Sequence, residues 1–113
     1  MSSTTKIKTS ELIVRVNLDE NNIPTEIHWK ATDLNKEFEP VKAFMLALWD
    51  EKEQNALRID LWRKDHTVEE MKIFFHQTLL TMADTFQKST GEKNMSDDLR
   101  DYCFHFAEKM KII

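Results

Sequence analysis

The spacing of apolar residues changes along this chain, and that change constrains the fold more than any other feature of the sequence. Between Leu12 and Ala31, apolar and polar side chains alternate, which is the period of a half-buried β-strand. Beyond Thr67, apolar side chains recur every three or four positions, which is the period of one face of an α-helix. The sequence therefore predicts an α+β protein with strands first and helices last.

Residues 12–31 are predicted to form an antiparallel hairpin. Two alternating runs are joined by Asp19-Glu20-Asn21-Asn22, and this connection has turn chemistry because Asn tolerates left-handed backbone angles and Asp bonds its own backbone. In the second run, Ile27, Trp29 and Ala31 share one face, while His28 lies on the other. Residues 1–10, rich in Ser, Thr and Lys, are predicted to be a flexible tail.

Three helices and one more strand are predicted after the hairpin. Pro40 suits the first position of a helix that runs to about Trp49, with apolar residues at helical spacing. Residues 57–61 alternate and predict a third strand. Thr67 and Glu70 form a capping-box sequence for the longest helix, which should end before Gly91. After a loop at residues 89–94, a last helix is predicted with Asp97 and Asp98 at its start.

The predicted order is β-β-α-β-α-α. Because each element has one apolar face to bury, the economical assembly is a small three-stranded antiparallel sheet packed on one face by three helices. The pattern leaves open where the third strand pairs. A chain of 113 residues can form one modest core, so residues 11–113 are predicted to be a single α+β domain.

Composition excludes several classes of partner. A net charge of −4 without clustered Lys and Arg argues against nucleic acid and against an anionic membrane surface. No run of 18 apolar residues is present, which argues against membrane insertion. The lone Cys103 cannot form an internal disulfide, which indicates a reducing compartment. The chain is therefore expected to be cytoplasmic.

The residues that carry chemistry lack the spacing that catalysis or metal binding needs. The four histidines show no zinc pattern, and a chain with one glycine cannot build a glycine-rich phosphate loop. No metal and no cofactor are therefore expected. An enzyme using His76 with Asp84 or Cys103 is the weakest hypothesis, because His76 and Asp84 would lie roughly 12 Å apart along one helix.

An unusual group of side chains falls on the outer side of the predicted sheet. Arg58, Asp60 and Trp62 alternate with the apolar residues of the third strand, and His28 could join them from the hairpin. An exposed Trp beside Arg has the composition of a protein-interface hot spot. The alternative is that Trp62 packs at the sheet rim beneath residues 50–55.

A pocket for a small apolar ligand is a second hypothesis. Six methionines and the aromatic residues could line an adaptable cavity between helices and sheet, although such residues more often form an ordinary core. The residues expected around that cavity are Trp29, Phe44, Trp49, Phe75 and Met82.

A resemblance to a known family rests on six segments, at residues 18–24, 46–50, 57–62, 68–79, 82–86 and 106–109. Together they resemble the gliding motility protein GldC family, over about residues 11–110. The resemblance implies a small cytoplasmic protein of gliding bacteria, accessory to the machinery that moves adhesins along the cell surface. It implies no enzyme activity, and it carries over no catalytic or cofactor-binding residue. The leading hypothesis is therefore a non-enzymatic accessory protein that contacts proteins of the gliding machinery, and a homo-oligomer is compatible with it.

Overall fold

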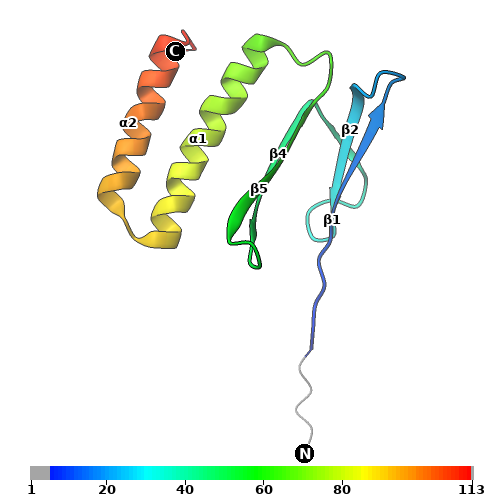
Figure 1. Cartoon of the computed structure of the whole chain (residues 1–113), viewed down its shortest axis with the longest axis horizontal. Helices are drawn as coiled ribbons and strands as arrows, with labels where there is room; N and C mark the ends of the chain where they lie inside the picture. The colour runs from blue at the N-terminus through cyan, green and yellow to red at the C-terminus, as the bar shows by residue number, and fades with distance from the viewer. Residues whose placement is uncertain (1–5, 113) are drawn as a thin grey trace, which may run out of the picture. The chain divides into compact units, whose positions relative to one another are not determined.

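A computed structural model describes residues 6–112 and contains both strands and helices (Figure 1). These residues form two compact units, one ending at His66 and the other beginning at Thr67. The first unit holds five strands and the second holds two helices, so the α+β prediction is confirmed. The prediction of three helices on one three-stranded sheet is wrong, as described below. Residues 1–5 of the predicted tail lie outside the described residues, and a single domain over residues 11–113 stays a prediction.

The first sheet has the strand order β1-β2-β3, with all pairs antiparallel. Its strands are β1 (Leu12–Leu18), β2 (Pro24–Ala31) and β3 (Glu39–Val41). The register pairs Val14 with Trp29 and Val16 with Ile27, which confirms the predicted hairpin and its faces. Ile27 exposes 0% of its surface, so it anchors the apolar face of this sheet.

The opposite face of this sheet is polar but well organised. The guanidinium of Arg15 lies 4.1 Å from the ring centroid of Phe38, and the ammonium of Lys30 lies 5.8 Å from it. Cations over an aromatic face are attracted by its quadrupole. On this face, Arg15 and Lys30 therefore share one aromatic contact, the ring of Phe38.

The turn between β1 and β2 is built on Asp19. Its Oδ1 accepts backbone N–H bonds from Asn21 at 2.8 Å and Ile23 at 3.0 Å. These bonds, with Lys64 nearby, lower the pKa of the Asp19 carboxyl. Asn22 takes the left-handed conformation, with φ of 62°, as its residue type allows.

The segment predicted as a helix from Pro40 to Trp49 is extended instead. It contains β3 and β4 (Ala43–Asp50), and β4 pairs antiparallel with β5 (Asn55–Trp62) in a two-stranded ribbon (Figure 1). A short run that is apolar throughout fits either period, and here the pairing with β5 decides. The third predicted strand is therefore present as β5, and its partner is β4.

The two sheets of this unit join at Lys42, the residue between β3 and β4. The Lys42 carbonyl accepts the N–H of Arg63 at 2.8 Å, and the Pro24 carbonyl accepts the N–H of Lys64 at 3.0 Å. The chain thus pairs with β2 before Lys42 and with β5 after it.

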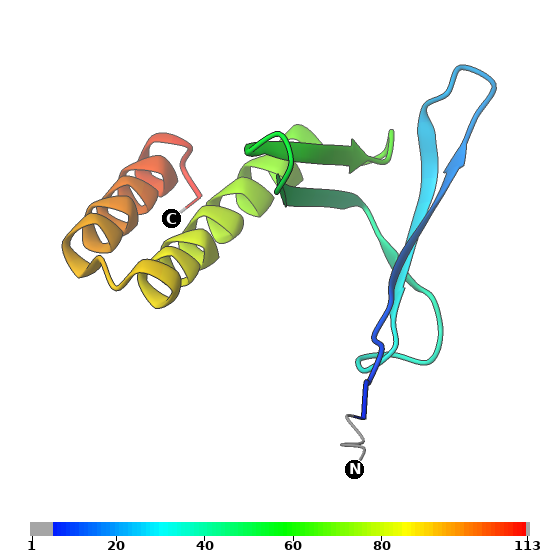
Figure 2. The same ribbon diagram turned by 60° about the horizontal axis from the view of Figure 1, so that its bottom comes forward.

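The second unit is a helical hairpin, seen in Figure 2 as two adjacent helices. The longer helix, α1 (Val68–Thr90), begins with the predicted capping box, in which Thr67 and Glu70 bond each other's backbone N–H. It ends at Gly91, whose φ of 75° is the left-handed conformation that glycine adopts without strain. Both predicted boundaries are confirmed.

The second helix, α2 (Lys93–Lys109), starts earlier than predicted. Asp97 and Asp98 lie inside it rather than at its start. Small residues are buried in this unit, which allows close packing of helix backbones; they are Ala83, Ser96, Cys103 and Ala107. At the edge of the hairpin, Arg100 on α2 bonds Asp84 at 2.9 Å and Gln87 at 2.8 Å on α1.

Candidate functional site

Arg58, Asp60 and Trp62 lie on one face of the β4–β5 ribbon. Successive side chains of a strand alternate between faces, so these three share a face and Leu57, Ile59 and Leu61 share the other. The register places Ala47, Met45 and Ala43 of β4 opposite Arg58, Asp60 and Trp62, in that order.

Arg58 and Asp60 bind each other along β5. The Arg58 Nη2 lies 2.8 Å from one carboxylate oxygen of Asp60, and its Nε donates to the other at 3.3 Å. The paired carboxylate raises the pKa of Arg58 above its usual value. Because both side chains remain partly exposed, the pair adds little to stability, but it fixes the orientation of two charged groups.

Trp62 projects into solvent at the base of the ribbon and exposes 53% of its surface. The alternative was that residues 50–55 cover it. That turn lies at the opposite end of the ribbon, beyond the Asp50–Asn55 pair, roughly 20 Å from Trp62 at the rise of a strand. The turn therefore does not reach Trp62.

Trp49 belongs to the same face, although the sequence pattern did not predict it there. The predicted helix placed Trp49 in a core, whereas its pairing with Ala56 sets it on the face of Trp62, where it is 69% exposed. The signal that could have revealed it is the short polar connection at 51–54 between two apolar runs, which is typical of a hairpin. We call this surface the tryptophan face; it comprises Ala43, Met45, Ala47 and Trp49 of β4 and Ala56, Arg58, Asp60 and Trp62 of β5.

His28 does not lie in this row. It belongs to β2, where the register places it between Arg15 of β1 and Pro40 of β3. The structure therefore brings together three of the four predicted surface residues and leaves His28 on the other sheet.

The reverse of the ribbon, which we call the apolar face, consists of large apolar residues. Ile59 at its centre is 47% exposed, and Leu48 and Leu57 are exposed to a similar degree. The ribbon thus presents large apolar side chains on both faces. The apolar face is formed by Phe44, Leu46, Leu48, Leu57, Ile59 and Leu61.

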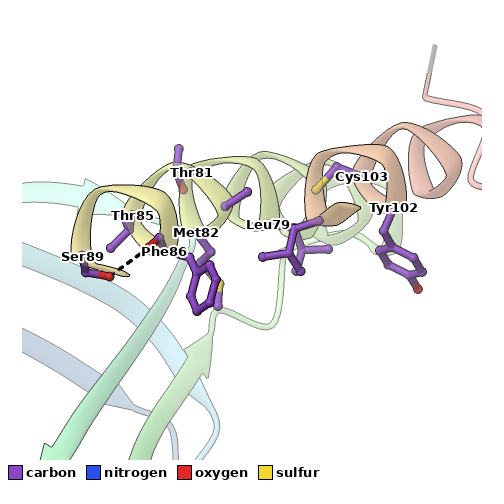
Figure 3. Close-up of a pocket in the computed structure, with 10 residues that line it drawn as sticks. Leu79, Thr81, Met82, Thr85, Phe86, Ser89, Tyr102 and Cys103 are labelled. Atoms are coloured by element: carbon purple, nitrogen blue, oxygen red, sulfur yellow. Dashed lines mark hydrogen bonds between the residues drawn. The ribbon is translucent and has the colours of Figure 1, made fainter. Parts of the chain in front are cut away.

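A separate pocket of about 400 Å³ lies between α1 and α2. Figure 3 shows Leu79, Phe86 and Tyr102 around it, and Met82 and Leu99 add further apolar surface. Of the five residues expected to surround a ligand cavity, Met82 is the one that lines this pocket.

The residues considered for catalysis have structural partners. The His76 ring stacks on Phe106 with centroids 6.3 Å apart, and Asp84 is bound by Arg100. Burial raises the pKa of the Cys103 thiol, which favours the unreactive protonated form. Within residues 6–112, no three His, Cys, Asp or Glu side chains converge as metal ligands would.

The hydrophobicity of the helices and three comparisons with known proteins bear on the identity of the chain. Neither helix in the described part of the chain combines the length and hydrophobicity needed to cross a bilayer. Searches of curated proteins and of solved structures found no match. The model of the GldC-like family, described as gliding motility-associated protein GldC-like, matches residues 24–112, which include β2 to β5 and both helices. The chain therefore belongs to the GldC-like family of gliding motility-associated proteins.

Proposed function

We propose that this protein is a non-enzymatic, cytoplasmic accessory of bacterial gliding that acts by binding a protein of the motility machinery through its tryptophan face. The role in gliding is inferred from family membership, because the family is described as gliding motility-associated. The chain's negative net charge and lack of a basic cluster favour a protein partner over nucleic acid.

The observation that carries this proposal is the pair of exposed tryptophans on one side of the ribbon. Trp49 and Trp62 stand near opposite ends, each facing an alanine on the neighbouring strand. Tryptophan and arginine are the residue types most enriched among interface hot spots. The ion pair of Arg58 with Asp60 lies between them and is oriented before any partner arrives.

The test is the double variant Trp62→Ala with Arg58→Glu. Both side chains are about half exposed, so the variant should keep the melting temperature close to that of the unmodified protein. Cells carrying it should lose colony spreading. Affinity isolation of the unmodified protein from motile cells should recover a partner that this variant does not recover.

A matched control is His28→Ala, which changes the other sheet and should leave spreading intact. The proposal fails if the double variant glides normally at normal abundance. It also fails if the double variant unfolds and spreading is lost with it, while a second, more conservative variant, Trp62→Phe with Arg58→Gln, stays folded and supports spreading.

The pocket between α1 and α2 favours a second candidate function, the carriage of a small apolar ligand. Its volume and its lining of Leu79, Met82, Phe86 and Leu99 fall in the range of ligand sites. A fluorescent fatty acid titrated into the protein should then bind saturably at one site. Leu99→Gln should weaken that binding at least tenfold, and equal binding by the variant would contradict carriage at this pocket.

A further inference from the structure

The outer edge of β4 is open and unprotected. Within residues 6–112, β4 pairs with β5 and with no other strand, although it is eight residues long. Its sequence has no charge before Asp50, and it contains neither proline nor glycine. Natural proteins protect such edges with charges, prolines or bulges, because an open apolar edge is a template for another strand.

The pairing with β5 shows which amides face this edge. The Arg63 N–H bonds the Lys42 carbonyl, and bonded pairs alternate along an antiparallel ladder. The backbone groups of Phe44, Leu46 and Leu48 therefore point at β5. Those of the intervening residues point to the open edge; they are Ala43, Met45, Ala47 and Trp49.

The other edge of the ribbon, formed by β5, is protected by charged side chains and by a backbone hydrogen bond to β2. β5 carries Arg58 and Asp60 at its centre, and charges on an edge strand discourage pairing. At its end, the N–H of Lys64 already bonds the Pro24 carbonyl of β2. The two edges thus differ in chemistry, and the β4 edge is the one suited to a further strand.

We propose that the open edge of β4 pairs antiparallel with β4 of a second copy of this chain, about a two-fold axis at Leu46. In this register, Lys42 of each copy faces Asp50 of the other, so opposite charges close both ends of the new ladder. An isologous contact of this kind places each residue against its counterpart by symmetry. The outward amides of Met45 face those of Ala47 in the second copy, as the hydrogen-bonding alternation requires.

The same register fits the sizes of the side chains. Trp49 lies opposite Ala43 of the second copy, so the large ring meets the smallest neighbour. Leu46 meets Leu46 at the axis, and Phe44 meets Leu48 on the same face. The apolar faces of the two ribbons become one continuous surface of a four-stranded sheet. Two-stranded ribbons are marginally stable in water, and a sheet of four strands is not.

The first test measures the mass of the purified full chain in solution. Light scattering should give twice the chain mass at micromolar concentration. Ala47→Pro removes an outward N–H without touching the ladder to β5, so it should raise the dimer dissociation constant at least tenfold. The matched control, Ala56→Pro, removes an outward N–H from the opposite edge of the ribbon and should leave the dimer intact.

The second test fixes the register and does not depend on proline. Residues opposite each other at a non-hydrogen-bonded pair lie close enough for a disulfide. Leu46→Cys should therefore form an interchain disulfide under mild oxidation. Leu48→Cys should not, because its counterpart in the second copy is Phe44. Cys103 is buried and remains in both variants.

A monomeric mass for the unmodified chain at high micromolar concentration overturns the proposal. A dimer that persists in the Ala47→Pro variant also overturns it, and so does a dimer that dissociates in the Ala56→Pro variant. Equal interchain crosslinking of the Leu46→Cys and Leu48→Cys variants overturns the proposed register. The inference is separate from the proposed motility contact. A chain that dimerises but glides normally after loss of the tryptophan face would retain this inference and lose the proposed function.

Discussion

The two sheets of the first unit differ in how completely they bury their apolar side chains. In the β1-β2-β3 sheet, Ile27 is fully buried, and the cations of the polar face lie over Phe38. In the β4–β5 ribbon, the central Ile59 is about half exposed and two tryptophans project from the other face. The first sheet buries its central residue completely although Leu12 and Leu18, at the ends of β1, stay about half exposed, whereas the ribbon leaves even its central residue about half exposed. We therefore expect the first sheet to contribute more to stability, and the ribbon is the element that we propose binds a partner.

The largest expected effect on stability comes from changing Ile27, the buried residue of the β1-β2-β3 sheet. Ile27→Ala should lower the free energy of unfolding by about 2–5 kcal/mol, because it removes buried methylene groups and leaves a cavity. Chemical denaturation at fixed protein concentration measures it. A loss below about 1 kcal/mol would show that Ile27 is not the anchor of that sheet.

The corresponding change in the ribbon, Ile59→Ala, should lower the free energy of unfolding by less. Ile59→Ala deletes the same atoms from a side chain that is 47% exposed, so about half of a full burial term, roughly 1 kcal/mol, is expected. The same denaturation experiment compares the two variants directly. If Ile59→Ala costs as much as Ile27→Ala, the apolar face of the ribbon is covered and the contrast between the sheets disappears.

The ribbon turn provides a local test. Asp50 Oδ1 accepts the N–H groups of Lys52 at 3.0 Å and Glu53 at 3.2 Å. Asp50→Ala removes both bonds and should destabilise the hairpin by about 1 kcal/mol. Asp50→Asn keeps an acceptor oxygen and should retain most of that stability. Equal losses in the two variants would indicate that charge, rather than hydrogen bonding, is what Asp50 contributes.

The smallest effect is a pH dependence of the first hairpin. The backbone N–H of Ile23, then that of Asn21, lower the pKa of Asp19. A lowered carboxyl pKa gives stability that is present above the unfolded pKa and lost as pH falls through the folded one. Between pH 5 and pH 2, Asp19→Asn should therefore lose less stability than the unmodified chain. Parallel curves would mean that the Asp19 charge adds nothing to folding.

Part of this architecture was predictable because its signals are local. The β1–β2 hairpin follows from strict alternation around an Asp-Asn turn, and the limits of α1 follow from the Thr67 capping box and Gly91. Each of these features fits within a few neighbouring residues, so no distant partner is needed to recognise it.

The ribbon was not predictable from the same signals. Residues 43–49 are all apolar, so their spacing satisfies a helix and a strand alike, and Pro40 favoured the helix. Pairing with β5 decides the conformation, and pairing is a non-local property. Because a helix was predicted there, Trp49 was not expected on the face of Trp62. Arg58, Asp60 and Trp62 were placed correctly on one face, because apolar and polar residues alternate clearly along β5.

Residue-resolved amide hydrogen exchange at two protein concentrations tests the role of the ribbon most directly. If the ribbon is a binding element whose β4 edge pairs with a second copy, exchange at Met45 and Ala47 should slow markedly on concentration. Exchange at Ile27, the buried residue of the other sheet, should not change. Exchange rates at Met45 and Ala47 that stay fast at every concentration would show that the β4 edge remains unpaired.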